Sequence, residues 1–239
     1  MELIQIVDRI MEGISYVDEH DLGGRVSRRT KIEYHPGVMT ISETELIQLV
    51  ALWWNAMHPE DFTPRNSLQT EVSYPNSGRN RCDFVFTTDN NLSLPEWGVE
   101  LKKPALIGDN GKNNDYNVPK VLSPYLKDRS LIHDIHRLSH ENIARKKAVV
   151  GFMFGYSPET CAEALMRHPN SADRIKEIQK VCNANDPSQL KLDPRVLVET
   201  ADIQFRHEGI VGELIIKEFK GLWRHPCGGD GVIFAWEVA

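Results

Sequence analysis

A run of seven residues without a polar side chain, 148–154, constrains the fold of this chain more than any other feature. A run of this length and composition is typical of a strand that lies at the centre of a sheet and is buried on both faces. The chain also offers amphipathic helices, because apolar residues recur at helical spacing over 3–14 and again after Ser42. We therefore expect an α/β fold with a mixed central β-sheet flanked by helices.

Shorter strand and helix patterns lie on both sides of this run. We expect strands over 67–74, 81–87 and 96–102 before it, and over 196–205, 212–219 and 232–238 after it. Helical patterns occur over 130–138, 159–167 and 172–181. The stretch 104–128 is rich in Gly, Asn, Asp and Pro, so we expect a long loop there, and long loops often carry function.

The composition indicates one folded domain over residues 1–239. Apolar side chains make up 41% and charged ones 26%, which excludes a disordered chain, and no Ser/Gly-rich linker divides the sequence. No stretch approaches the ~20 apolar residues of a membrane span, and the N-terminus lacks the pattern of a secretion signal. The four cysteines lie far apart without a CxxC pair, so we expect a cytoplasmic protein with reduced thiols and no membrane contact.

The charge distribution limits how the chain could meet nucleic acid. A net charge of −6 disfavours a general nucleic-acid coat protein, which would be basic. Residues 101–150, however, carry ten Lys and Arg against five Asp and Glu, a net of +5. A second group of bases, Arg25, Arg28, Arg29 and Lys31, forms either a solvated turn or a phosphate contact. We therefore expect a local basic surface on an acidic protein.

Two neighbouring strands carry the residues with the clearest chemical meaning. Glu100 and Lys102 share one face of their strand because strand side chains alternate, and Asp83 lies near the start of the preceding strand. If these strands pair antiparallel, Asp83 and Glu100 meet, and their repulsion calls for a cation. Mg²⁺ suits that need, since it prefers one or two carboxylates together with water and phosphate oxygens. A nearby lysine could orient or deprotonate an attacking water, which is the arrangement for metal-assisted phosphodiester hydrolysis.

The helix that Ser42 begins adds another carboxylate. Its expected inward face is Leu46, Val50, Trp53 and Met57, and Glu43 falls within the same arc. Glu45, three residues after Ser42, fits a capping box on the polar flank. An inward glutamate is costly to bury unpaired, so Glu43 indicates a nearby cation, although the sequence leaves Glu45 open as the acid at the site.

This order of an acidic helix, a strand with Asp83, the strand Glu100-Leu101-Lys102, a polar helix and an apolar strand resembles the PD-(D/E)XK nuclease superfamily. That superfamily has the restriction-endonuclease-like fold. The resemblance covers about residues 40–155, which would form the nuclease-like core, with 156–239 as a C-terminal α+β elaboration. Cys82 stands before Asp83 where the family name has proline.

The resemblance implies a Mg²⁺-dependent DNA endonuclease of the restriction or defence type, in which Mn²⁺ could substitute for Mg²⁺. Arg137, on the polar helix, would hold the scissile phosphate, and the Leu101 carbonyl would join the carboxylates as a metal ligand. Cleavage of both strands of a duplex would favour a homodimer, whose two-fold axis matches the pseudo-symmetry of DNA. The positions that match the family's catalytic residues are Glu43, Asp83, Glu100 and Lys102.

The same residues allow a second interpretation. Glu100 and Lys102 could form a solvated pair on an exposed sheet face, with Asp83 at a strand edge where its charge opposes aggregation. A separate alternative keeps the fold and these residues but does no chemistry: a catalytically silent protein with a nuclease fold, which binds nucleic acid or acts as a scaffold without needing a divalent ion.

Two unrelated sites also stay open. His133, His136 and His140 have helical spacing that could supply zinc ligands, although no further ligands are evident in the sequence. Cys227, in a Gly-rich segment, could pair with a histidine as the nucleophile of a hydrolase, although a turn before the last strand is the simpler reading.

Overall fold

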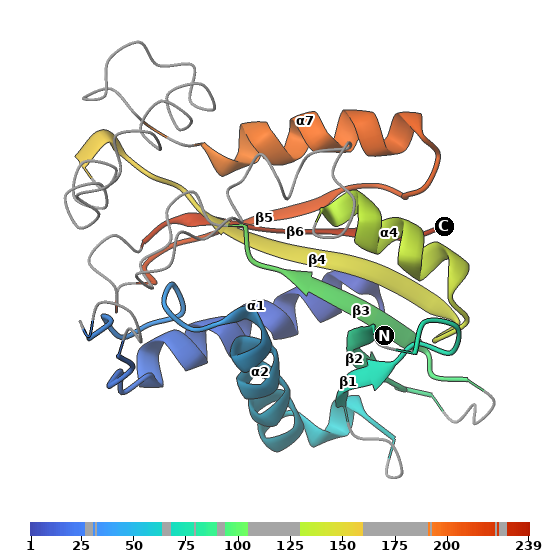
Figure 1. The fold of residues 1–239 in the computed structure, drawn as a ribbon, viewed down its shortest axis with the longest axis horizontal. Helices are drawn as coiled ribbons and strands as arrows, with labels where there is room; N and C mark the ends of the chain where they lie inside the picture. Colours follow the sequence, from blue (N-terminus) through green and yellow to red (C-terminus); the bar gives the residue numbers. More distant parts are fainter. Residues whose placement is uncertain are drawn as a thin grey trace.

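The computed structural model describes residues 1–26, 31, 33–63, 68–78, 80–89, 94–104, 130–159, 191, 193–222, 224 and 229–239. In these ranges the chain forms one sheet with helices packed against it (Figure 1). The helices are α1 (Leu3–His20), α2 (Glu43–Met57), the short 3-10 helix η1 (Pro59–Asp61), α4 (Leu131–His140) and α7 (Pro194–His207). The helices expected over 159–167 and 172–181, and nearly all of the loop expected over 104–128, lie outside the described residues.

Within the described ranges the sheet has six strands in the order β1-β2-β3-β4-β6-β5. They are β1 (Gln69–Ser73), β2 (Arg81–Phe86), β3 (Trp97–Lys102), β4 (Lys146–Phe154), β5 (Ile215–Phe219) and β6 (Gly231–Glu237). β3 and β4 run parallel, and the other neighbouring pairs run antiparallel. The predicted mixed sheet flanked by helices is therefore confirmed, and the apolar run forms most of β4, between β3 and β6.

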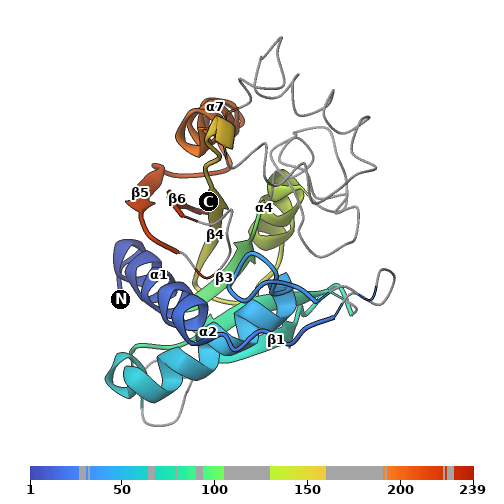
Figure 2. The same ribbon diagram turned by 90° about the vertical axis from the view of Figure 1, so that its left-hand side faces the viewer.

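Helices cover both faces of the sheet (Figure 2). On one face lie α1 and α2, where Trp54 packs against Phe86 of β2. On the other face lie α4 and α7, where Phe205 packs against Trp236 of β6. The central strand β4 is buried from Ala148 to its end, which explains why its sequence is apolar without alternation.

The start of α2 follows the sequence prediction, but its inward face does not. The Ser42 hydroxyl accepts a hydrogen bond of 3.2 Å from the Glu45 amide, so Ser42 is the N-cap. The buried stripe consists of Leu46, Ile47, Val50, Ala51 and Trp54. The expectation that Met57 points inward is wrong: it is the last residue of the helix and its side chain is exposed, so the stripe ends one turn earlier, at Trp54.

The strand predicted over 196–205 is also wrong, because this segment lies in helix α7. The Asp193 side chain accepts a hydrogen bond of 3.0 Å from the Arg195 amide, and Pro194 occupies the first turn, where it needs no amide partner. Val198, Ala201 and Phe205 are buried at helical spacing. The β-branched residues of the segment gave it a strand-like composition. The cap at Asp193 and the helical spacing of the buried residues show that it forms a helix.

Candidate active site

Strands β2 and β3 bring Asp83 and Glu100 together. The two strands pair antiparallel with Phe84 opposite Val99, so the next position in this register sets Asp83 opposite Glu100. Asp83 Oδ2 accepts a hydrogen bond of 2.7 Å from the Leu101 amide. Both carboxyl groups are buried, with 8% of Asp83 and 2% of Glu100 exposed. Burial first, and then the charge of Glu100, raise the pKa of the Asp83 carboxyl well above its usual range.

The backbone of Leu101 adds an oxygen to this pair. In a strand, the N–H and C=O of one residue point to the same side. Since the Leu101 amide donates to Asp83, its carbonyl faces the same edge. Two carboxylates and a carbonyl are hard oxygen donors of the kind that Mg²⁺ binds. Among the described residues, no group of three or more His, Cys, Asp or Glu side chains is arranged to hold a metal ion, so any ion here would rely on the two carboxylates, the backbone and water.

Lys102, at the end of β3, lies between two further carboxylates. Its Nζ is 3.3 Å from Glu43 Oε1 and 3.1 Å from Asp134 Oδ2. Burial by itself would lower the pKa of this ammonium, but the charges of Glu43 and Asp134 outweigh burial and raise that pKa. The two carboxylates therefore favour the charged form of Lys102.

The N-terminus of α2 places Glu43 at the end of β3. Glu43 Oε2 accepts a hydrogen bond of 2.9 Å from the Lys103 amide, while its Oε1 contacts the ammonium of Lys102. Glu45 takes part in the helix cap through its backbone, since its amide donates to the Ser42 hydroxyl. Of the two acids that the sequence leaves open, Glu43 is the one that the structure brings to Lys102. It contacts the lysine rather than the Asp83–Glu100 pair.

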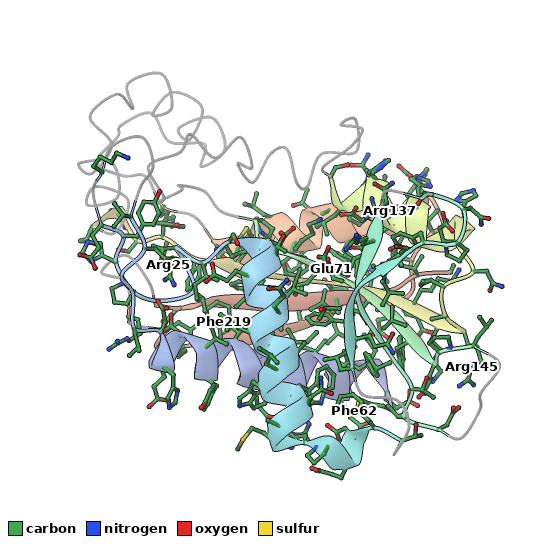
Figure 3. The ribbon with its side chains drawn as sticks, turned by 60° about the horizontal axis from the view of Figure 1, so that its bottom comes forward. Arg25, Phe62, Glu71, Arg137, Arg145 and Phe219 are labelled. Atoms are coloured by element: carbon green, nitrogen blue, oxygen red, sulfur yellow. The ribbon has the colours of Figure 1, made fainter. Side chains whose placement is uncertain are left out.

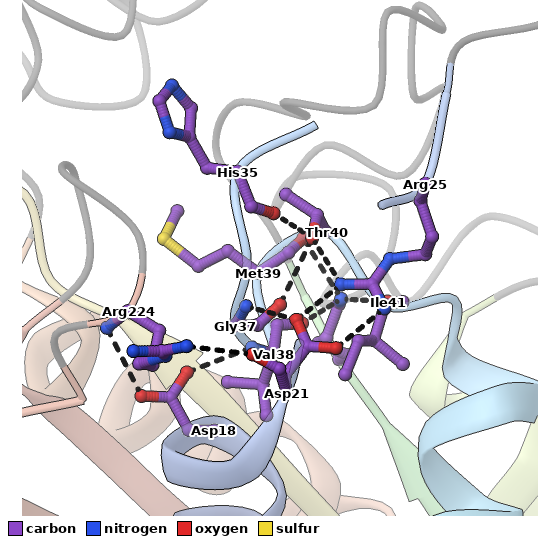
Figure 4. A network of polar contacts seen from close by, with 11 residues as sticks. Asp18, Asp21, Arg25, His35, Gly37, Val38, Met39, Thr40, Ile41 and Arg224 are labelled. Atoms are coloured by element: carbon purple, nitrogen blue, oxygen red, sulfur yellow. Dashed lines mark hydrogen bonds and ion pairs between the residues drawn. The ribbon is translucent and has the colours of Figure 1, made fainter. Parts of the chain in front are cut away.

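A network of polar contacts fixes the loop that leads into α2 (Figure 4). The ammonium of Lys103 donates to the carbonyls of Val38, Met39 and Ile41 at 2.8, 3.2 and 2.5 Å. On the other side of the loop, Asp18 accepts a hydrogen bond of 2.9 Å from the Val38 amide. The loop is thus held between α1 and the end of β3, and it presents Glu43 to Lys102.

Arg137 on α4 lies over the same strands (Figure 3), but it is already paired. Its Nη2 is 2.7 Å from Glu100 Oε1 and 2.5 Å from Asp134 Oδ1. The guanidinium also stands over the Tyr74 ring, 5.3 Å from the centroid, and the Tyr74 hydroxyl donates to Glu100. The sequence analysis assigned Arg137 to a phosphate, whereas here it is bound to a carboxylate of the expected metal pair.

Asp134 and Tyr74 are the members of the site that sequence reasoning missed. Asp134 is 3% exposed and contacts both cations of the site. Its spacing of three residues from Arg137 on one helix face was a usable signal. Tyr74 follows β1 and had no such signal, because its hydroxyl reaches Glu100 only through the pairing of three strands.

The backbone of β1 is irregular beside Asp83. Thr70 pairs with Phe84 and Val72 with Cys82, so this register sets Glu71, labelled in Figure 3, opposite Asp83. Glu71 has a φ of 56°, in the left-handed region that residues with a side chain rarely adopt. Irregular strand positions occur often beside active sites, where they redirect a side chain. Here the irregularity coincides with the point at which the Asp83 carboxylate turns to the Leu101 amide.

The two alternative sites receive no support from the described residues. His140 Nδ1 lies 2.7 Å from the carbonyl of His136, and His136 is 3.8 Å from a carboxylate of Glu208, so these rings do not converge on a common point with further ligands. Cys227 lies outside the described residues, as do Arg28 and Arg29 of the basic group.

Compared with known proteins, the chain matches no family model, no curated protein and no solved structure. In the part of the chain that the structure describes, no helix combines the length and the apolar character needed to cross a bilayer. The function is therefore argued from the geometry of the site.

Proposed function

We propose that the chain is a Mg²⁺-dependent nuclease that hydrolyses phosphodiester bonds, with a restriction-endonuclease-like core and, by the resemblance, DNA as substrate. The proposal is supported by one observation, the charged cluster of Glu43, Asp83, Glu100, Lys102, Asp134 and Arg137. In this cluster four carboxyl groups share two cationic side chains. Buried charge that is not balanced is costly, and a divalent cation is the ligand that would balance it.

The donor set fits Mg²⁺, and Mn²⁺ as its substitute. Asp83, Glu100 and the Leu101 carbonyl would hold the ion, because they present hard oxygens at one strand edge. When bound, Mg²⁺ would polarise the phosphate and lower the pKa of a water molecule. Burial and the charge of Glu100 both disfavour the charged form of Asp83 and raise its pKa, and a bound cation would favour that charged form.

The other side chains of the cluster would position the water and the phosphate. Lys102 would orient the attacking water, because Glu43 and Asp134 hold its ammonium in place and raise its pKa. Glu43 would hold Lys102 in place and so support the metal site through the lysine. Arg137 carries a fixed positive charge beside Glu100, where it would hold a phosphate oxygen.

Two wider parts of the proposal rest on the resemblance: a role in restriction or other defence, and a homodimer that cuts both strands of a duplex. The proposed cytoplasmic location rests instead on the widely separated cysteines. The second candidate is a catalytically silent protein with the same fold. The pairing of Arg137 with Glu100 favours it, because an ion pair at that position occupies an expected metal ligand.

Cleavage of supercoiled plasmid separates these two functions. The wild-type protein is incubated with Mg²⁺, with Mn²⁺ and with EDTA, beside Lys102→Ala and the control Lys217→Ala. Lys217 lies on β5, on the far side of β4 and β6, and pairs with Asp8 at the surface. We expect cleavage with either ion by the wild type and the control, and none with EDTA or in Lys102→Ala. Cleavage that survives in both Lys102→Ala and Asp83→Asn would overturn the assignment, and DNA binding without cleavage in any ion would favour the silent protein.

A further inference from the structure

The hydrogen bonds of Arg137 are distributed unevenly. One nitrogen, Nη2, serves both Glu100 Oε1 and Asp134 Oδ1, at 2.7 and 2.5 Å. Its Nε is buried and has no hydrogen-bond partner among the described residues. A guanidinium usually pairs with a carboxylate through two nitrogens, which gives both strength and direction. The contact between Arg137 and Glu100 therefore uses the charge of the arginine and little of its hydrogen-bonding capacity.

Asp134 also has a buried atom without a hydrogen bond among the described residues. Its Oδ1 contacts Arg137, and its Oδ2 is buried, 3.1 Å from Lys102 Nζ but without hydrogen-bond geometry. Asp134 and Arg137 are three residues apart on α4, so their contact does not depend on the sheet. Arg137 would therefore stay attached to α4 through Asp134 if its bond to Glu100 were lost.

Glu100 Oε1 is the atom at which these contacts compete. It accepts from Arg137 Nη2 and from the Tyr74 hydroxyl, and the whole side chain is buried. A divalent cation bound to Asp83 and Glu100 would repel the guanidinium and take electron density from the same carboxylate. Arg137 and a metal ion at this pair therefore compete for one oxygen of Glu100.

We propose that Arg137 is an exchangeable counter-ion of Glu100, which a divalent cation displaces while Asp134 keeps the guanidinium beside the site. This inference rests on the proposed metal site and deepens it. Displacement frees one N–H of Nη2 while the other stays on Asp134, and this N–H together with the unpaired Nε could meet two oxygens of a phosphate. The metal ion would therefore bind first, and the phosphate would bind to the released guanidinium of Arg137 afterwards.

Calorimetric titration of Mn²⁺ into the DNA-free protein tests the exchange. The variants are Arg137→Gln and the matched control Arg145→Gln, which removes an equal charge from a surface arginine that is paired with Asp89 (Figure 3). We expect Arg137→Gln to bind Mn²⁺ at least about tenfold more tightly than the wild type, equal to about 1.4 kcal/mol, and Arg145→Gln to leave the affinity unchanged. Equal or weaker binding by a folded Arg137→Gln would overturn the exchange and leave the metal site standing. No binding by the wild type or by either variant would overturn the metal site itself.

A second measurement covers the case in which Arg137→Gln does not fold, and it separates displacement from a purely electrostatic effect of the lost charge. In wild-type protein labelled with ¹⁵N-arginine, the Nε–H signals are followed during titration with Mg²⁺, which is diamagnetic. We expect one arginine signal to shift with the same midpoint as metal binding, and Arg137→Lys, which retains the charge, to lack that signal. If metal binds and every arginine signal stays in place, the exchange is refuted.

Discussion

At the scale of single residues, the ammonium of Lys102 joins three elements of the fold. It projects from β3 and lies between Glu43 of α2 and Asp134 of α4. Such a position fixes a charge in space more firmly than a surface pair would, because both partners are themselves held by other bonds: Glu43 by the Lys103 amide and Asp134 by Arg137. A lysine that orients an attacking water beside a phosphate would need its ammonium held in such a fixed position.

Substitution of Glu43 tests this role. Glu43→Gln removes one of the two ion pairs that Lys102 forms among the described residues, so we expect the rate of plasmid cleavage to fall by about tenfold to a hundredfold. Glu45→Gln changes the same turn of α2 but not a contact of Lys102, and we expect its rate to match the wild type. Equal rates for the two variants would show that Glu43 has no part in the reaction.

A second single-residue prediction concerns acid stability. Burial favours the neutral form of Asp61, but hydrogen bonds from Arg9 (2.7 Å) and Trp54 (2.9 Å) outweigh it, and the pKa of Asp61 is lowered. A carboxyl whose pKa is lower in the folded than in the unfolded protein stabilises the fold above its unfolded pKa, and that stability is lost as the pH falls through the folded pKa.

We therefore expect Asp61→Asn to reduce the free energy of unfolding by about 2 kcal/mol at neutral pH. The difference between variant and wild type should shrink below about pH 4, where the unfolded chain takes up its proton. Urea unfolding from pH 7 to pH 3 measures it. A difference that stays constant over this range would contradict the assigned ion pair.

At the scale of elements, α7 shows where sequence patterns mislead. Its β-branched residues favoured a strand, but Ile203 is 71% exposed while Phe205 is fully buried against Trp236. In a strand these two residues would share a face, because they are two positions apart, whereas in a helix they lie on different sides. A cap at Asp193 followed by Pro194 was the local signal for a helix.

Two alanine substitutions check this helix. We expect Phe205→Ala to reduce the free energy of unfolding by about 3–5 kcal/mol, because it leaves a cavity against β6. Ile203→Ala should change it by no more than about 0.5 kcal/mol, because its side chain is in solvent. Similar large losses for both variants, measured by urea unfolding, would instead support the strand.

Most of the other elements were predictable from sequence. β4 and β6 contain continuous apolar runs, and α4 has apolar residues at helical spacing, as their burial reflects. The site was predictable in part, since Asp83, Glu100 and Lys102 lie on adjacent strands with a fixed register. The contacts of Arg137 were not predictable, because they depend on where α4 is placed along the sheet, and no local pattern sets that position.

At the scale of the whole molecule, β6 joins the C-terminal part to the core. It pairs with β4 from Ala148↔Glu237 to Phe154↔Gly231, along the strand that also pairs with β3. We therefore expect that the core over about 40–155 and the later elaboration are not independent folding units, since removal of the elaboration would expose the edge of β4 that pairs with β6.

A truncation measures this dependence. We expect a fragment of residues 1–155 to lack a cooperative thermal transition, and the full chain to unfold in a single one, because β4 needs β6 to complete the sheet. Circular dichroism and calorimetry of both chains give the comparison. A sharp, native-like transition in the fragment would show that the core folds alone.

The central claim is that Asp83 and Glu100 form a divalent metal site, and calorimetric titration of Mn²⁺ into wild-type protein and Asp83→Asn tests it most directly. Asp83→Asn keeps the size of the side chain and removes its charge. The account predicts saturable binding to the wild type and an affinity at least about tenfold lower in the variant. Absence of binding to the wild type, or equal affinity for both proteins, would contradict it.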